Sequence, residues 1–182
     1  RERFLREART AARLTHPNVV PIYRADEMRG LVFFVMAYVG GEALAVRLAS
    51  RGPMPPGQTA RLLRDVALAL GYAHARGIVH RDVKPENILI ERDTNRPLVT
   101  DFGIARLAEA SPLTATGQVL GTVHYMSPEQ VSGETLDGRS DLYSLGVVGF
   151  RMLSGRLPFD SATASAVLVA HVTKQAPSLE AA

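Results

Sequence analysis

The 182-residue sequence contains no cysteine, which excludes disulfide bonds, thiol nucleophiles and cysteine-ligated zinc. It also lacks a long apolar run, because the longest, Leu31 to Val39, is too short to cross a bilayer. Nor is one sign of charge dominant, since 21 basic and 18 acidic residues leave a formal charge of +3. So small an excess does not indicate binding to nucleic acid or to a membrane within this segment. What remains, 46% hydrophobic and 21% charged residues, is typical of a globular protein.

The spacing of apolar residues predicts a mixture of short strands and helices. A helical repeat runs over residues 4–14 and ends before Pro17, because a residue that precedes proline is disfavoured in helical geometry. Two β-rich runs, Val19 to Arg24 and Leu31 to Tyr38, are separated by a turn-like segment and indicate a hairpin. Three further helices are expected, over residues 42–50, from the prolines at 53–56 up to Gly77, and over residues 137–154.

The last of these helices is predicted to be buried. Apolar residues occur on nearly all of its sides between Leu142 and Leu153, and a helix that is apolar all round is a core helix. Asp141 lies within it and is therefore expected to be desolvated. A desolvated carboxylate needs hydrogen-bond donors, so Asp141 should contact a specific partner.

Two polar motifs carry the chemistry. The first is HRDVKPEN, from His80 to Asn87, and the second is DFG, which begins at Asp101. Both lie on loops beside short strands, where catalytic groups collect. Carboxylate and amide oxygens are ligands that suit Mg²⁺, lysine supplies a compact charge for phosphate, and a second carboxylate that binds no metal can accept a proton. The set indicates metal-assisted phosphoryl transfer.

These motifs resemble those of the eukaryotic-type protein kinase family. HRDVKPEN fits the kinase catalytic loop H-R-D-x-x-x-x-N, and DFG fits the magnesium-binding motif. Lys84 followed by Pro-Glu-Asn is similar to the serine/threonine subclass, and Thr114-x-Thr116 before GTVHYMSPEQ is similar to bacterial serine/threonine kinases. Four more features agree in order and spacing, namely HPNVV, Gly121-Thr122, Ser127-Pro128-Glu129, and DLYSLG from Asp141.

The resemblance implies roles for the catalytic loop. Asp82 would accept the proton of the attacking hydroxyl, and Lys84 would contact the transferring phosphoryl group. Asn87 and Asp101 would hold the Mg²⁺ ions that bridge the nucleotide phosphates. Asp141 would gain the partner that its burial requires, by hydrogen-bonding the backbone of the HRD turn.

The resemblance also implies a nucleotide site. Glu7 matches the glutamate that pairs with the ATP-anchoring lysine. Met36 falls at the gatekeeper position, and Tyr38 and Val39 belong to the hinge that receives adenine. The implied cofactors are ATP and Mg²⁺, for which Mn²⁺ could substitute.

Regulation and substrate binding are implied in the same way. Arg81 would receive a phosphate placed on Thr114 or Thr116 by autophosphorylation, a charge-assisted contact that orders the loop. Thr122 matches the threonine of the substrate loop that bridges the catalytic aspartate and lysine. The implied partners are proteins with serine or threonine acceptors, and a second copy of the kinase for autophosphorylation in trans.

The implied fold is α+β, the two-lobe fold of protein kinases. Residues 1–36 would be a remnant of the small lobe, with a helix and β-strands, and residues 37–182 the hinge and a mostly helical large lobe that is incomplete at its C-terminus. The sequence has no G-x-G-x-x-G, and its only lysines are Lys84 and Lys174. We therefore expect a fragment with little or no activity alone, from a cytoplasmic kinase whose parent protein could be membrane-anchored.

Two alternatives stay open. A pseudokinase or signalling scaffold would lack the upstream lysine, although all catalytic residues of the large lobe are intact. A small-molecule phosphotransferase of the aminoglycoside kind shares an H-x-D-x-x-x-x-N loop, but the Ser-Pro-Glu motif and the threonine-bearing segment argue against it, because they dock peptides in kinases.

The histidines are interpreted as structural. His80 is expected to stack on Phe102 in the core column that joins the kinase lobes. The other four show no metal-ligand spacing and are interpreted as surface or packing residues: His16, His74, His124 and His171.

Overall fold

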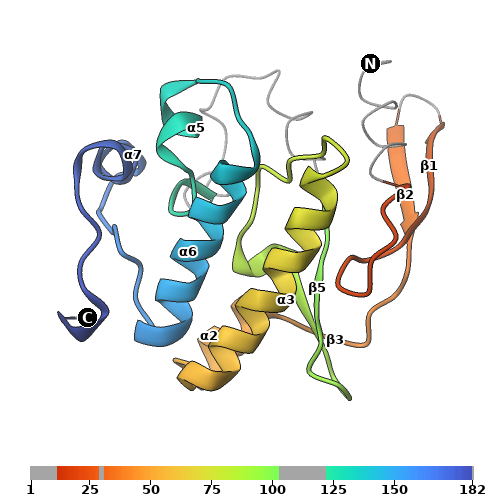
Figure 1. The fold of residues 1–182 in the computed structure, drawn as a ribbon, viewed down its shortest axis with the longest axis horizontal. Helices are drawn as coiled ribbons and strands as arrows, with labels where there is room; N and C mark the ends of the chain where they lie inside the picture. The colour runs from red at the N-terminus through yellow and green to blue at the C-terminus, as the bar shows by residue number, and fades with distance from the viewer. Residues whose placement is uncertain (1–11, 29–30, 103–121, 182) are drawn as a thin grey trace.

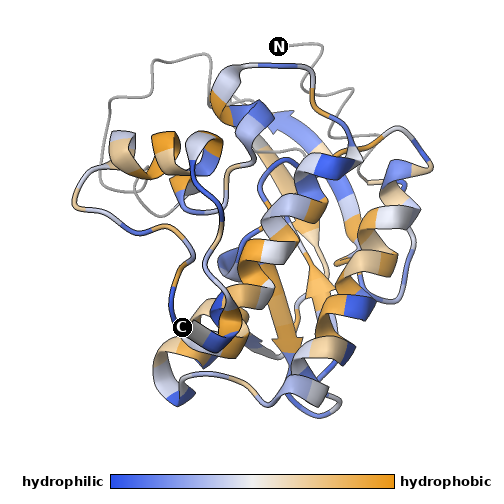
Figure 2. Ribbon diagram, turned by 60° about the vertical axis from the view of Figure 1, so that its left-hand side comes forward, coloured by the Kyte–Doolittle hydropathy of each residue, from blue (hydrophilic) through white to orange (hydrophobic). Residues whose placement is uncertain are grey.

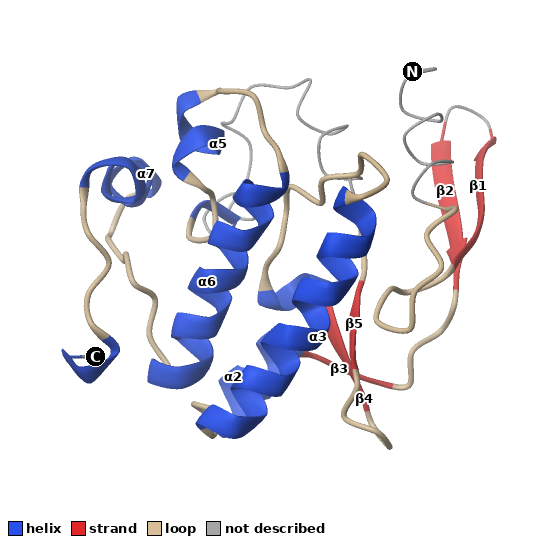
Figure 3. Cartoon of the chain, in the orientation of Figure 1, coloured by secondary structure: helices blue, strands red, loops and turns tan. Residues whose placement is uncertain are grey.

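The computed structural model describes residues 12–28, 31–102 and 122–181, which form an α+β fold with two small sheets and a larger helical part (Figures 1 and 3). A pair of strands stands at one side of the molecule, and most of the helices lie toward the opposite side. The elements are β1 (Ile22–Met28), β2 (Leu31–Met36), β3 (Gly41–Ala43), α2 (Leu44–Arg51), α3 (Pro56–His74), the 3-10 helix η1 (Pro85–Asn87), β4 (Ile88–Glu91), β5 (Pro97–Val99), α5 (Pro128–Ser132), α6 (Gly138–Ser154), α7 (Ala164–Thr173) and η3 (Leu179–Ala181). None of the helices in these ranges is long and apolar enough to span a lipid bilayer.

The predicted hairpin is confirmed, with different bounds. Strands β1 and β2 pair antiparallel, and Met28 lies opposite Leu31. The first strand begins and ends later than the β-rich run predicted, because Asp26 and Glu27 continue the ladder opposite β2 instead of forming the turn. Pairing with β2 in this two-stranded sheet overrides the low strand propensity of the acidic residues.

The second sheet has the order β3-β4-β5, with both pairs antiparallel. Its first strand corrects the helix predicted from residue 42, because Gly41 to Ala43 pair with β4 and the helix begins only at Leu44. Gly41 approaches β4 so closely that a Cβ there would lie 2.0 Å from the carbonyl oxygen of Ile90. Only glycine fits this contact.

The core is formed where the helices pack on the second sheet. Helices α3 and α6 are in direct contact, and their inner sides and the strands are largely hydrophobic (Figure 2). The fully buried side chains of Leu70, Ile88, Ile90 and Met152 come from both layers. The all-round burial predicted for α6 is wrong on one side, because Leu142 is 52% exposed. Apolar composition alone does not show which side of a helix meets a neighbour.

Gly138 lies against His74, and this contact yields a stability prediction. A Cβ at Gly138 would lie 2.5 Å from Nδ1 of His74, whose Nε2 is held by Asp141. We expect Gly138→Ala to lower the free energy of unfolding by about 1–3 kcal/mol, as overpacking does. Urea denaturation measures the change. In the same helix a Cβ at Gly146 would meet nothing within 4 Å, so Gly146→Ala should stabilise by about 0.5–1 kcal/mol. Equal effects of the two substitutions would contradict the contact.

His171 on α7 makes stability depend on pH. Its side chain is buried, its Nδ1 is 2.8 Å from the hydroxyl of Tyr143, and its ring lies against Phe159. Burial lowers the pKa of His171 below the ordinary value, so the folded state disfavours the protonated ring. Stability is then fully present above the unfolded pKa of about 6.5 and falls as the pH drops through it.

We therefore expect urea midpoints to be lower at about pH 5.5 than at about pH 7.5. His171→Gln should reduce this difference. Burial also lowers the pKa of His16, so part of the difference should remain in the variant. A difference that is unchanged by His171→Gln would refute the assignment.

Candidate active site

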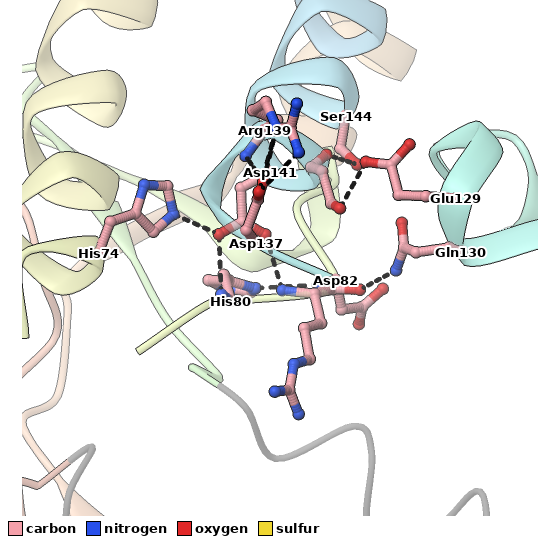
Figure 4. Close-up of polar contacts among 11 residues, drawn as sticks. His74, His80, Asp82, Glu129, Gln130, Asp137, Arg139, Asp141 and Ser144 are labelled. Carbon is pink, nitrogen blue, oxygen red and sulfur yellow. Dashed lines mark hydrogen bonds and ion pairs between the residues drawn. The ribbon is translucent and has the colours of Figure 1, made fainter. Parts of the chain in front are cut away.

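The loop that carries the HRD motif is fixed by Asp141 from the first turn of α6 (Figure 4). The carboxylate is 1% exposed. It accepts hydrogen bonds from the backbone N–H of His80 to Oδ2 and of Arg81 to Oδ1, each at 2.8 Å. The predicted partner of this buried carboxylate is thus confirmed. Arg81 adopts a φ of 69°, a left-handed conformation that costs energy in a non-glycine residue and persists where its surroundings hold it.

His74 belongs to this network, which the sequence interpretation missed. Its Nε2 lies 2.7 Å from Oδ2 of Asp141 (Figure 4), so it is more than a surface or packing residue. No periodicity or ligand spacing marks His74, since its partner is 67 positions away in the sequence. The Asp141 carboxylate is thus contacted by His74 as well as by the N–H groups of His80 and Arg81.

Asp82, Lys84 and Asn87 meet on the loop between α3 and β4. Oδ2 of Asp82 lies 2.7 Å from Nζ of Lys84 and accepts a hydrogen bond of 3.0 Å from Nδ2 of Asn87. The same amide donates to the backbone carbonyl of Asp82 at 2.8 Å. Both donors thus hold one carboxylate oxygen, and Oδ1 makes no hydrogen bond to any residue within the described ranges. The side chain of Asp82 is 13% exposed.

Thr122 lies beside the same cluster. Nζ of Lys84 donates to its Oγ1 at 3.0 Å, so Lys84 contacts both Asp82 and Thr122. The sequence prediction placed Thr122 between the catalytic aspartate and lysine. In the structure the lysine is the group in the middle.

The β4–β5 ladder brings Asn87 and the DFG segment to the same end of the second sheet. Ile88 pairs with Val99, and the N–H of Thr100 donates to the carbonyl of Asn87 at 3.0 Å. Asp101 therefore directly follows Thr100, which is hydrogen-bonded to Asn87. Its φ of 63° lies in the left-handed region, which is uncommon for a residue other than glycine.

This pair of residues fits a magnesium ion. Mg²⁺ commonly takes one or two carboxylates, keeps several waters and completes its shell with substrate phosphates. The Asp101 carboxylate and the side-chain oxygen of Asn87 are hard oxygen donors of this kind. The described residues contain no group of three or more histidine, cysteine, aspartate or glutamate side chains that could hold a metal alone.

His80 and Phe102 pack as predicted. Phe102 is buried and its ring centroid lies 4.6 Å from that of His80. Nε2 of His80 is 2.8 Å from the carbonyl oxygen of Thr100. The ring of His80 thereby joins the catalytic loop to the strand that carries Asp101.

The segment predicted to receive adenine connects β2 to β3. The N–H of Ala37 donates to the carbonyl of Pro21 at 2.8 Å. Oγ1 of Thr100 contacts the sulfur of Met36 at 3.9 Å, which places Met36 beside the residue that precedes Asp101. Tyr38 is 94% exposed and Val39 is half-buried.

The start of helix α5 contacts the catalytic loop. Ser127 and Gln130 form a capping box at its start. Nε2 of Gln130 also donates to the carbonyl of Arg81 at 2.7 Å. The S-x-x-Q spacing reveals the capping box from sequence, but not this second contact. Gln130 is thus another residue of the site that the sequence interpretation missed.

The segment 122–127 is anchored to α6. Oγ of Ser144 donates to the carbonyl of Tyr125 at 2.6 Å, and Nη1 of Arg151 donates to its hydroxyl at 2.5 Å. Burial raises the pKa of Tyr125, although the hydrogen bond from Arg151 acts to lower it. The phenol therefore stays protonated at neutral pH. Tyr125 is thus held to α6 both at its backbone carbonyl and at its hydroxyl.

Glu129 links α5 to α6. Its Oε1 accepts a hydrogen bond of 2.5 Å from Oγ of Ser140. Burial raises the pKa of Glu129, but the hydrogen bonds from Ser140, Ser127 and its own backbone N–H outweigh this effect, and the pKa is lowered. The group is charged at neutral pH and contributes stability that is lost as the pH falls through its folded pKa.

Some predicted residues lie outside the described ranges. They are Glu7, Thr114 and Thr116, together with Gly103 and Gly121 of the motifs. For Arg81 the structure places the backbone between Asp141 and Gln130. Its role toward a phosphate stays a prediction.

The comparison with known families assigns the chain. A family model described as a protein kinase domain matches residues 1–180. The chain therefore belongs to the protein kinase family, as the resemblance of its motifs predicted. Members of this family use ATP and a divalent metal ion and act on protein substrates.

The relatives that the chain matches are named bacterial serine/threonine-protein kinases. The chain is 43% identical over 176 residues to the serine/threonine-protein kinase PrkC of Bacillus subtilis (strain 168), which covers 97% of this chain and 27% of that protein. It is 45% identical over 175 residues to the serine/threonine-protein kinase PknB of Mycobacterium leprae (strain TN), with 93% and 28% covered. The chain thus spans little more than a quarter of these curated relatives.

A solved structure confirms the fold. The crystal structure of the Mycobacterium tuberculosis PknI kinase domain matches with a TM-score of 0.76 at 32% identity, covering 99% of this chain and 63% of that chain. The predicted α+β kinase fold, with part of the two lobes, is confirmed.

Proposed function

We propose that the protein containing this chain is a serine/threonine kinase that transfers the γ-phosphoryl group of ATP to serine and threonine hydroxyls of proteins. The observation that carries this proposal is the arrangement around Asp82. One of its carboxylate oxygens is held by Lys84 and Asn87, and the other makes no hydrogen bond to a described residue. The loop beneath it is fixed by the buried Asp141.

Each residue of the cluster would have one task. The free oxygen of Asp82 would orient the acceptor hydroxyl and take its proton as the oxygen–phosphorus bond forms. Lys84, already turned toward Asp82 and Thr122, would neutralise negative charge that develops on the transferring group. Asn87 keeps Asp82 in place with two hydrogen bonds from one amide. Little covalent chemistry is left to the protein, since positioning and charge dominate phosphoryl transfer.

The nucleotide and metal would bind at the neighbouring end of the second sheet. The donors there suit Mg²⁺, with Mn²⁺ as a substitute, and Asp101 and Asn87 would hold the ions. A bound ion would neutralise charge on the phosphates of ATP. Met36, Tyr38 and Val39 would receive adenine, and Glu7 would pair with the ATP-anchoring lysine.

Regulation would act through the segment before Thr122. We propose that Thr114 and Thr116 are autophosphorylated, in trans within a kinase homodimer, and that Arg81 receives the phosphate. The domain boundary is proposed between residues 36 and 37. The separate pairing of β1 with β2, apart from the β3-β4-β5 sheet, supports this boundary. Cytoplasmic ATP would supply the reaction.

Dependence on a divalent ion tests the proposal. The full-length gene product is incubated with radiolabelled ATP and casein over a range of Mg²⁺ concentrations. We expect EDTA to abolish transfer and Asp101→Asn to raise the Mg²⁺ concentration for half-maximal rate by about tenfold or more, because a carboxylate ligand is lost. Asp93→Asn, an exposed carboxylate in the turn at the opposite end of the β4–β5 pair, is the matched control and should leave the requirement unchanged. Transfer that persists in EDTA would contradict the proposal.

A further inference from the structure

A groove lined by arginines lies between α2, the beginning of α3 and the turn that joins β4 to β5. Its volume is about 810 Å³, and a hollow of about 340 Å³ shares Arg47, Arg51 and Asn95 with it. None of the residues placed in the active site lines either space. We call this surface the arginine groove, and its basic residues are Arg47, Arg51, Arg61, Arg92 and Arg96.

The positive charge of the groove is only partly neutralised. The acidic residues among its lining are Glu42 and Asp65, and Nη2 of Arg96 lies 3.1 Å from Oε1 of Glu91, which does not line the groove. Glu42 is shared, since its Oε1 lies 3.0 Å from Nε of Arg47 and 2.9 Å from Nη2 of Arg51. Asp65 is paired with Arg64, which does not line the groove. Since the whole chain carries only +3, this is a local concentration of charge.

Three of the arginines are exposed to a ligand. Arg61 and Arg92 are exposed, and neither forms an ion pair with a residue in the described part of the chain. Arg51 is 64% exposed at its side chain although it contacts Glu42. A ligand could therefore reach these three guanidinium groups without displacing the core.

The chemistry of the lining favours an acidic polypeptide. Guanidinium groups bind carboxylates through paired N–H donors, and Glu42 between two arginines shows that the groove already accommodates a carboxylate. Pro53, Met54 and Pro97 add apolar surface between the charges. The lining contains no aromatic side chain, whereas single-stranded nucleic acid is generally bound with aromatic groups that stack on the bases.

We propose that the arginine groove is a docking site for an extended acidic segment of a protein substrate, with aspartate or glutamate residues interspersed with apolar ones. The inference rests on the proposed kinase function, because the docked protein would be the one phosphorylated. Tethering raises the effective concentration of the acceptor at the active site without a new contact there.

Binding tests the proposal without phosphoryl transfer. The probe is a fluorescein-labelled peptide of about ten residues that alternates glutamate with leucine, measured by fluorescence anisotropy in the absence of ATP. We expect Arg51→Glu with Arg61→Glu to weaken binding by about tenfold or more. Added salt should weaken binding to the wild-type protein.

The control is Arg24→Glu with Arg156→Glu, which changes the net charge by the same amount outside the groove. Arg24 is 67% exposed and pairs with Asp26, as Arg51 pairs with Glu42. Arg156, like Arg61, is exposed, and no ion pair joins it to a residue that the structure describes. The control should change the affinity by less than about twofold. Equal weakening by both pairs of substitutions, absence of binding, or tighter binding of a single-stranded oligonucleotide would overturn the proposal.

A second readout separates docking from catalysis. The acidic peptide is fused to a serine-containing acceptor, and the groove variant should raise KM for this substrate with kcat unchanged. It should leave KM for the untailed acceptor unchanged. Peptide binding with no phosphoryl transfer by the wild type would contradict the kinase function while leaving the groove as a binding site. Transfer without a KM effect of the tail would overturn docking alone.

Discussion

Asp82→Asn should reduce the rate of phosphoryl transfer by about 10²–10⁴-fold, the range that a general base contributes. Asparagine has the same shape but cannot accept the proton of the acceptor hydroxyl. The substitution also removes the charge that Nζ of Lys84 meets at 2.7 Å. Because Asp82 is not among the residues proposed to hold the nucleotide, the Kd for ATP should change little.

Steady-state kinetics of the full-length gene product and nucleotide titration measure the two quantities separately. Asp137→Asn is the control, since an asparagine can replace the cap at the start of α6, where Asp137 accepts from the N–H of Arg139. Its rate should stay within about twofold of the wild type. If Asp82→Asn transferred phosphate as fast as the control variant, Asp82 would have no role in the reaction.

Asp141→Ala should have the largest effect on stability, a loss of about 3–5 kcal/mol in the free energy of unfolding. The substitution leaves the N–H groups of His80 and Arg81 without their acceptor and His74 without its partner. An unsatisfied buried donor costs about 1–3 kcal/mol. The left-handed conformation of Arg81 would also lose its restraint, so the catalytic loop should relax and kcat should fall.

Urea denaturation measures the loss, and two companion variants sharpen it. Asp141→Asn keeps one oxygen acceptor, so its free energy of unfolding should lie between those of the wild type and Asp141→Ala. This variant can still be measured if Asp141→Ala does not fold. Asp137→Ala makes the same change at an exposed cap in the same helix and should cost about 1 kcal/mol. Equal losses for the alanine variants of Asp137 and Asp141 would show that the buried network is not what fixes the loop.

Much of the polar cluster was predictable from the sequence because it lies in contiguous motifs. Asp82, Lys84 and Asn87 fall within one loop, and the burial of Asp141 follows from an acidic residue in an apolar helix. His74 and Gln130 were not predictable in their roles, because each contacts a residue that is remote in sequence. Such contacts depend on how α3, α5 and α6 pack, which local patterns do not encode.

The same limit explains the errors in the fold. Apolar periodicity located the helix α3, and apolar residues on nearly all sides located α6, because long segments carry a strong local signal. It misplaced the start of α2, because Gly41 to Ala43 have a strand conformation only through pairing with β4. It also overestimated the burial of α6 at Leu142. Where a partner strand or helix decides the outcome, the sequence pattern alone does not.

The most direct test of the central claim maps phosphate by mass spectrometry on the full-length gene product after incubation with Mg²⁺ and ATP. Asp82→Asn is treated in the same way. A working kinase predicts phosphate on Thr114 or Thr116 in the wild-type protein and none in the variant. Nucleotide binding without phosphate on either protein, or on an added protein substrate, would contradict the kinase function and indicate a signalling scaffold.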